Sequence, residues 1–267
     1  MLKRFYRSIG ILICCFWPLV ISPAWSVEQP KASKAPTIEL QAAQVLKQMT
    51  DYLKGLQQFS VQTEITEDVL LDSGLKIQDG RSTTVSVRRP DRLRVDSVGD
   101  VDDRQLFYDG KTLTLMDRGK NVYSTIDAPP EIDAALNHAI QAYNLRVPLA
   151  DLIYANAYDN LTEKALAGFY LGLSKVQGVP CHHLAFRQKD LDWQIWIENG
   201  PTPLPRKFLI TDNKAKAKGL QFTALLSQWN TSPQLEDGLF TFVVPANAQT
   251  VDLRPVAAPV GPKKTGK

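Results

Sequence analysis

The run Cys181-His182-His183 is the clearest group of potential metal ligands in the sequence. Zinc is held by thiolate and imidazole groups, but a zinc site needs three or four of them. Alternate side chains of a β-strand point to opposite faces, so Cys181 and His183 would share a face while His182 points away. His138 could add a ligand only from a separate helical segment. We therefore expect packed strand residues here, and neither a metal nor another cofactor.

Residues that could catalyse a reaction are few. Only three histidines are available as general bases, and no G-x-S-x-G nucleophile elbow occurs. The segment 109–112 (D-G-K-T) resembles the end of a phosphate-binding loop, but the earlier glycine of that loop would have to stand at Gln105. It predicts a hairpin turn instead. Asp190 and Asp192 flank a turn and are most simply solvated. We expect a protein that is not an enzyme.

Large apolar side chains suggest a different chemistry, the binding of an apolar ligand. Trp193 and Ile195 share one face of a predicted strand whose other face carries Trp196, while Phe208 and Phe222 lie on the two strands that follow. Most large apolar residues are buried, so most of these are expected to belong to the core. Those on the inner face of a curved sheet would line a cavity if one exists, which periodicity alone leaves open.

The elements that carry these residues follow from the spacing of apolar positions. A repeat of three or four between Ile38 and Leu56 predicts an amphipathic helix with Thr37 as its N-cap. From Phe59 the period is two, which predicts about ten or eleven strands. The twelve runs with this period lie around 61–66, 83–87, 93–96, 106–108, 112–116, 122–126, 169–176, 181–187, 193–198, 206–211, 220–229 and 239–244.

A helical insertion divides these strands. Apolar residues at helical spacing follow Pro129, and a second short helix is predicted over 149–154, after Pro148. The other connections are too short for crossover helices, so we expect an antiparallel sheet. A sheet of this many strands curls because strand twist accumulates, and a partly filled concave side forms an apolar cavity. If the helical pieces fill that side completely, no cavity remains.

The N-terminus has the pattern of a secretory signal. A basic stretch (1–7) precedes an apolar run (9–21), and Ala24 and Ser26 lie two apart, which predicts a signal peptide over 1–26 with cleavage after Ser26. The apolar run is shorter than the ~20 residues of a spanning helix, and Pro18 interrupts it. We therefore expect export to the periplasm and no permanent membrane span after cleavage.

Composition describes the rest of the chain. The 31 Lys and Arg exceed the 28 Asp and Glu by three, and all three extra cations lie in the predicted signal peptide. A mature chain without net charge has no electrostatic reason to bind nucleic acid. Of three cysteines only Cys181 would remain, which excludes an internal disulfide. We predict a linker at 27–36, one folded domain at 37–253 and a disordered tail at 254–267.

Several segments, in this order, resemble the superfamily of periplasmic lipoprotein carriers and receptors of the LolA/LolB type, which includes LppX-like lipid carriers and the sensor domain of RseB-type regulators. They are L-K-G-L-Q-Q-F-S (53–60), V-R-R-P-D-R-L-R (87–94), Y-D-G-K-T-L-T-L (108–115), the Pro-led segment 148–154 and F-T-F-V-V-P-A-N-A (240–248). The segments C-H-H-L-A-F-R, D-W-Q-I-W-I and P-L-P-R-K-F-L-I-T resemble more closely a group of predicted periplasmic proteins of unknown function within that superfamily.

This resemblance implies an α+β fold in which a curved antiparallel sheet forms an incomplete β-barrel, with an N-terminal helix and a helical lid on its concave side. In the carrier, the arginine of the V-K-R-P motif contacts the lid backbone and helps to hold it closed, and Arg89 occupies that position here. An exposed edge-strand arginine is the alternative. The Cys181 motif and the composition of the insertion at 129–158 depart from the carrier, which puts a lipoprotein cargo in doubt.

Two functions remain open at this stage. The first is a periplasmic carrier that encloses an acyl chain, a lipid or a lipoprotein anchor beneath the lid, with Arg89, Trp193, Ile195, Trp196, Phe208 and Phe222 as candidate lid or ligand residues. The second is an envelope regulatory or scaffolding module that binds a partner protein through the same sheet. The carrier predicts an enclosed void, whereas the scaffold predicts a filled concavity and an exposed apolar patch.

Overall fold

The computed structural model describes residues 37–255, except 102, 146, 148 and 215–218. The predicted signal peptide (1–26), the linker (27–36) and all but the first two residues of the tail (254–267) lie outside the described residues. None of the helices in the described ranges has the length and hydropathy that a membrane crossing requires.

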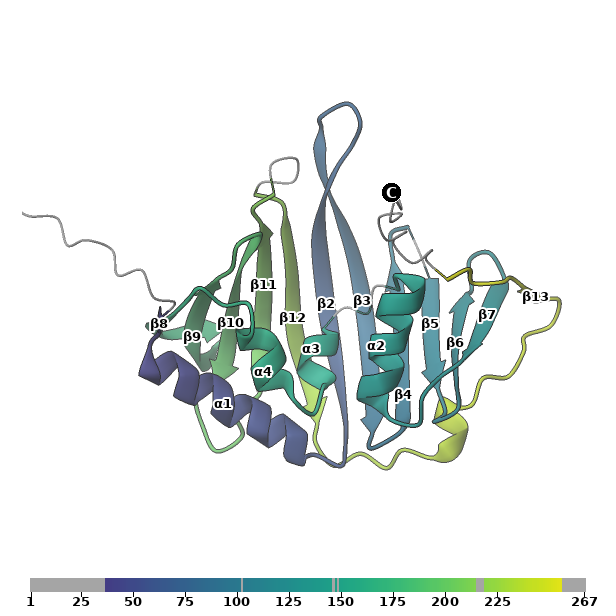
Figure 1. The fold of residues 1–267 in the computed structure, drawn as a ribbon, viewed down its shortest axis with the longest axis horizontal. Coiled ribbons are helices and arrows are strands. Elements are labelled where there is room, and N and C mark those ends of the chain that lie inside the picture. Colours follow the sequence, from purple (N-terminus) through teal and green to yellow (C-terminus); the bar gives the residue numbers. More distant parts are fainter. Residues whose placement is uncertain (1–36, 102, 146, 148, 215–218, 256–267) are drawn as a thin grey trace, which may run out of the picture. The chain divides into compact units, whose positions relative to one another are not determined.

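The described chain alternates strands with a few helices (Figure 1). In order, the elements are β1 (Thr37–Ile38), α1 (Leu40–Gly55), β2 (Gln58–Leu70), β3 (Lys76–Arg88), β4 (Arg92–Gly99), β5 (Asp103–Tyr108), β6 (Thr112–Asp117), β7 (Val122–Asp127), α2 (Ile132–Tyr143), α3 (Ala150–Ile153), α4 (Ala157–Thr162), β8 (Ala167–Val176), β9 (Val179–Arg187), β10 (Leu191–Glu198), β11 (Pro205–Asp212), β12 (Gln221–Asn230), the 3-10 helix η1 (Asp237–Phe240) and β13 (Gln249–Thr250).

The strands form one sheet built from two antiparallel meanders, β2 to β7 and β8 to β12. The meanders join because β12 pairs antiparallel with β2. The short strands β1 and β13 add to the outer strands β8 and β7 in parallel. Since β1 and β13 stand at the two ends of the strand order, this thirteen-stranded sheet of the described residues does not close into a barrel. The predicted fold class, an open and mostly antiparallel sheet with helices, is confirmed.

All the α-helices contribute to the covering of one face of the sheet, which we call the helix-covered face (Figure 1). Helix α1 packs against β8 and β10 and also contacts α3 and α4. Its buried side chains recur every three or four residues, as an amphipathic helix requires: Ala42, Val45, Leu46, Met49, Thr50 and Leu53. Helix α2 buries four residues in the same core, against the first meander: Ile132, Ala135, Leu136 and Ala139.

The predicted start of the first helix is wrong by two residues. Thr37 is not its N-cap: Thr37 and Ile38 pair with β8, the helix begins at Leu40, and Glu39 precedes it without a side-chain cap. The backbone N–H of Glu39 donates to the carbonyl of Gly168, while its carboxylate accepts from the N–H of Tyr170. The unpaired edge of β8 thus binds this segment as a strand.

The predicted last strand (239–244) is also wrong. Residues Asp237–Phe240 form the 3-10 helix η1, and the following segment runs over the face of the sheet opposite the helices. Phe240 is fully buried there, and the ring of Phe242 lies 5.4 Å from that of Phe107 and 5.1 Å from that of Tyr123. Phe240 and Phe242 alternate as they would in a strand, but they belong to a segment that packs across the sheet without pairing as a strand.

Candidate binding pocket

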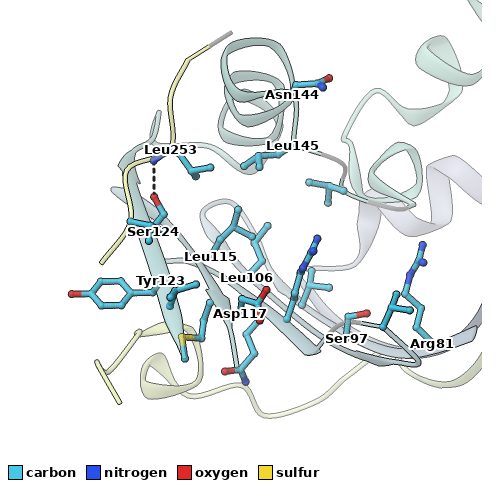
Figure 2. Close-up of a pocket in the computed structure, with 18 of the residues that line it drawn as sticks. Arg81, Ser97, Leu106, Leu115, Asp117, Tyr123, Ser124, Asn144, Leu145 and Leu253 are labelled. Carbon is cyan, nitrogen blue, oxygen red and sulfur yellow. Dashed lines mark hydrogen bonds between the residues drawn. The ribbon is translucent and has the colours of Figure 1, made fainter. Parts of the chain in front are cut away.

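A pocket of about 690 Å³ lies on the helix-covered face of the first meander. Its floor is formed by β2 to β7, and its roof by the segment that follows α2 together with the chain after β13. Figure 2 shows Leu145 and Leu253 on one side of the space and Leu106 and Leu115 on the other. This volume lies within the range of small-molecule binding sites, which is roughly 300–1,000 Å³.

The strand register arranges the floor in cross-strand rows of increasing polarity. The inner row is covered by α2 and is apolar: Phe59, Val87, Leu93, Tyr108, Leu113 and Ile126. The middle row is apolar except at its end: Val61, Val85, Val95, Leu106, Leu115 and Ser124. The polar row follows: Thr63, Thr83, Ser97, Arg104, Asp117 and Val122. The last four residues of the middle and polar rows line the pocket.

The roof depends on two local features. Asn144 ends α2 in the left-handed conformation (φ 53°), which asparagine tolerates, and the N–H of Leu145 donates to the carbonyl of Ala139. At the other side, the N–H of Leu253 donates to the hydroxyl of Ser124 over 3.2 Å, as Figure 2 shows. The side chains of Leu145 and Leu253 therefore belong to the lining of the pocket.

Charged groups line the end of the pocket away from the inner row. Arg81 Nη2 lies 3.3 Å from the carboxylate of Glu67, and Asp79, Arg104 and Asp117 lie on neighbouring strands of the same lining. Burial raises the pKa of Asp117, but hydrogen bonds from Lys120 and the charges of Lys120 and Arg104 outweigh it and lower that pKa. Asp117 is therefore a carboxylate at neutral pH.

A second feature of this face is the contact between Arg89 and α3. Arg89 Nη2 donates a 2.7 Å hydrogen bond to the carbonyl of Ile153, the last residue of α3. Burial lowers the pKa of Arg89, and the nearby carboxylate of Asp133 opposes that change. Asp133 also accepts from the N–H of Ala155, and the hydroxyl of Tyr154 donates to Asn137. We call α2 and α3, which these bonds connect, the lid.

The space directly beneath α3 is nearly filled. A cavity of about 20 Å³ remains there, which is room for about one water molecule. Its walls are apolar side chains from the sheet and from the lid: Phe59, Val61, Val85, Leu149, Leu152, Ile153, Leu226 and Trp229. Helix α3 is thus packed on β2, β3 and β12, whereas the larger pocket opens beside it, mainly over β4 to β7.

Most of the apolar side chains proposed from the sequence lie in the other half of the sheet. Trp193, Ile195 and Phe208 are buried in the core with α1, and the ring of Trp193 stacks on that of Phe186 at 4.0 Å. Phe222 packs against the same core and is partly buried. None of these residues lines the pocket of 690 Å³.

The two remaining groups of candidates have polar neighbours. Trp196 lies on the opposite face of the sheet, where it stacks on His183 at 4.1 Å and Lys207 Nζ lies 4.6 Å from its ring centroid. His182 Nδ1 is 2.9 Å from the hydroxyl of Tyr170. Within the described residues, no three His, Cys, Asp or Glu side chains converge as metal ligands, and Cys181 is buried.

The residues that line the pocket were missed because their short strands look ordinary in the sequence. A usable signal exists in β5 and β6, where Arg104 and Leu106, and likewise Asp117 and Leu115, stand two residues apart on one face. An apolar and a charged residue on the same face of a strand indicate a surface that is buried at one end and exposed to solvent at the other. That pattern does not identify which elements form the roof.

The comparisons with known proteins concern the family and the fold. Residues 42–254 match the family model described as "Predicted periplasmic protein (DUF2092)". No curated protein matches the sequence.

Three solved structures can be given as examples. The Pseudomonas aeruginosa MucA/MucB complex is 16% identical over 76% of this chain, with a TM-score of 0.42, and the match spans 61% of that chain. Mycobacterium tuberculosis lipoprotein LppX is 14% identical over 73% of this chain and 98% of its own, with a TM-score of 0.44. A LolA superfamily protein from Nitrosomonas europaea is 12% identical over 75% and 97%, with a TM-score of 0.39.

Proposed function

The chain belongs to the DUF2092 family of predicted periplasmic proteins, and from this premise we propose that it is an exported, non-enzymatic binding or carrier protein. Its ligand is an acyl chain, a lipid or a lipoprotein anchor held in the pocket beside the lid. The proposal includes removal of the signal peptide 1–26, a folded domain over 37–253 and a tail over 254–267. In this proposal Arg89 holds the lid, and the residues that line the pocket bind the ligand.

One observation carries the proposal: in the pocket of about 690 Å³, Leu145 and Leu253 of the roof face an apolar part of the floor formed by Val95, Leu106 and Leu115. Burial of one methylene group contributes about 0.8 kcal/mol, so roughly ten methylenes would contribute about 8 kcal/mol before the cost of association. Micromolar binding requires about 8 kcal/mol net of that cost, so a longer acyl chain is needed to reach it. A hydrocarbon chain can therefore be held without any charged contact.

Extraction of the purified mature protein with organic solvent, followed by mass spectrometry, tests the proposal. We expect stoichiometric lipid in the wild type and its loss in Leu115→Trp, because an indole at this partly exposed floor position fills the pocket. Leu209→Trp is the matched control, since Leu209 is also partly exposed, lies on β11 and does not line the pocket. A lipid-free wild type that also binds no apolar dye contradicts the carrier function.

The second candidate is the envelope module that binds a partner protein, and exposed apolar side chains on β8 favour it. Phe169, Leu171 and Leu173 are 43%, 54% and 61% exposed. Under this function, their replacement by serine removes the protein from a native envelope complex separated by size, while Leu115→Trp leaves the complex intact. Under the carrier function, Leu115→Trp removes the bound lipid, whereas the serine replacements on β8 leave it in place.

A further inference from the structure

The floor of the pocket becomes more polar in one direction along the strands. On β5 the step from Leu106 to Arg104, and on β6 the step from Leu115 to Asp117, passes from the middle row to the polar row. Two residues of a strand span about 7 Å. A ligand that follows the strands therefore meets hydrocarbon at one end and charge at the other, so the pocket orients an amphiphile.

The apolar end is set by the inner row and by the roof. The inner row lies beneath α2, and Leu145 and Leu253 close the space above the middle row. An acyl chain gains free energy only where it leaves water, so its terminus belongs at this end. The head of the ligand must then lie at the polar row, near Ser97, Arg104 and Asp117.

Both signs of charge line the polar end. The cations are Arg81 and Arg104, and the carboxylates are those of Glu67, Asp79 and Asp117. Lys120 adds a third cation from the adjoining turn, where its Nζ lies 3.2 Å from Asp117. Two cations and three carboxylates thus line this end, and Lys120 beside it brings the cations to three.

This balance selects among headgroups. A head that carries only negative charge would pair with Arg81 or Arg104 but would also lie among three carboxylates, and bringing like charges together in a partly buried site is unfavourable. A neutral head would leave partly desolvated charges without new partners. A head with a phosphate and an ammonium group can satisfy both signs, because guanidinium binds phosphate and carboxylate binds ammonium.

We propose that the pocket recognises a zwitterionic lipid, with its phosphate at Arg104, its ammonium group at Asp117, and its acyl chain beneath Leu145 and Leu253. The inference rests on the proposed function, because it names the class of ligand for the same pocket. Arg104 and Asp117 are direct cross-strand partners, so the phosphate and the ammonium group would bind to neighbouring side chains.

Displacement of the apolar dye Nile red from the mature protein tests the headgroup. Three probes share one palmitoyl chain: lysophosphatidylethanolamine is zwitterionic, lysophosphatidylglycerol is anionic and monopalmitoylglycerol is neutral. We expect the zwitterionic lipid to bind about tenfold more tightly than either of the others, which corresponds to about 1.4 kcal/mol. Equal binding of all three probes, or tighter binding of the anionic or the neutral probe, would overturn the inference.

Charge-removing variants locate the recognition. Arg104→Gln should weaken the two phospholipids without affecting monopalmitoylglycerol, and Asp117→Asn should reduce the preference for the zwitterionic over the anionic lipid by about tenfold. The matched controls are Arg187→Gln and Asp192→Asn, because Arg187 and Asp192 also pair across two strands and lie outside the pocket. Thermal unfolding checks that each variant is folded.

The outcomes separate the inference from the proposed function. If the three lipids bind equally and the pocket variants behave as the controls do, the headgroup assignment fails while lipid binding stands. If Nile red and all three lipids fail to bind the folded wild type, the proposed function itself fails. Zwitterionic preference that disappears in Asp117→Asn and persists in Asp192→Asn supports the inference.

Discussion

Replacement of Arg89 by leucine should weaken the attachment of α3 to the sheet without unfolding the domain. The guanidinium donates to the carbonyl of Ile153 at the end of α3, and this carbonyl would lose a charged donor in the variant. The remaining bonds of the lid, from Tyr154 to Asn137 and from Ala155 to Asp133, do not involve Arg89. The lid therefore keeps part of its attachment.

The magnitude follows from that one bond. A hydrogen bond that involves a charged group contributes about 1.5–3 kcal/mol to stability. Arg89 is partly buried, so solvent screening reduces this value less than for a surface pair. Because about 1.4 kcal/mol changes an equilibrium tenfold, the population with α3 open should rise roughly 10- to 100-fold.

Amide hydrogen exchange measures the opening directly, since exchange reports the free energy of local unfolding. The N–H of Tyr154 bonds to Ala150, and that of Ala155 bonds to Asp133, so both should exchange roughly 10- to 100-fold faster in Arg89→Leu. Arg89→Lys, which keeps the charge but not the planar fork, should give a smaller increase. A folded Arg89→Leu variant with wild-type exchange at both amides would refute the role of Arg89 in the lid.

Three further predictions concern the core and its response to pH. Trp193→Ala should lower the free energy of unfolding, measured in urea, by about 3–5 kcal/mol because the side chain is buried. Lipid binding by the folded variant should not change. Loss of binding by a folded variant would place Trp193 in the site. Gly168→Ala should cost about 1–3 kcal/mol in the same measurement, since an added Cβ would lie 2.7 Å from the Phe186 ring, whereas the control Gly200→Ala meets no neighbour. Burial raises the pKa values of Tyr108 and Tyr154 from 10.0 to about 12, so both phenols stay neutral in the folded protein while they ionise in the unfolded chain. The stability that they contribute is complete below pH 10.0 and should fall as the pH rises to about 12. A free energy of unfolding that does not change with pH across this range would contradict the reasoning.

Predictions of secondary structure that depend on neighbouring residues were correct, and those that depend on contacts between distant parts of the chain were wrong or missing. The period of two between Phe59 and Asp127 predicted the strands of the first meander, because alternation is a property of neighbouring residues. The same rule failed for 239–244, where Phe240 and Phe242 alternate but pack as a strap against side chains far away in the chain. Helix α4 and the parallel pairing of β1 were not anticipated, since both depend on contacts with distant elements.

The candidate site shows the same contrast between local pattern and distant contacts. Aromatic residues such as Trp193 and Phe208 were expected to line a cavity if they lay on the inner face, and they do lie on the helix-covered face, but α1 fills the space above them. The pocket lies instead over Leu106 and Leu115, which stand in short strands without a comparable signal. Volume left empty depends on the packing of every neighbouring element, so it cannot be read from one strand.

The sequence by itself determined the alternation of helix and strand, the antiparallel class and the resemblance to predicted periplasmic proteins, which the family match confirms. Tertiary structure decided the rest: β12 joins the two meanders, α1 and α2 cover different halves of the face, and Leu253 reaches Ser124 from 129 residues away to complete the roof. The physical reason is that periodicity records which side of an element avoids water. It does not record which other element provides the cover, and a pocket exists only where that cover is incomplete.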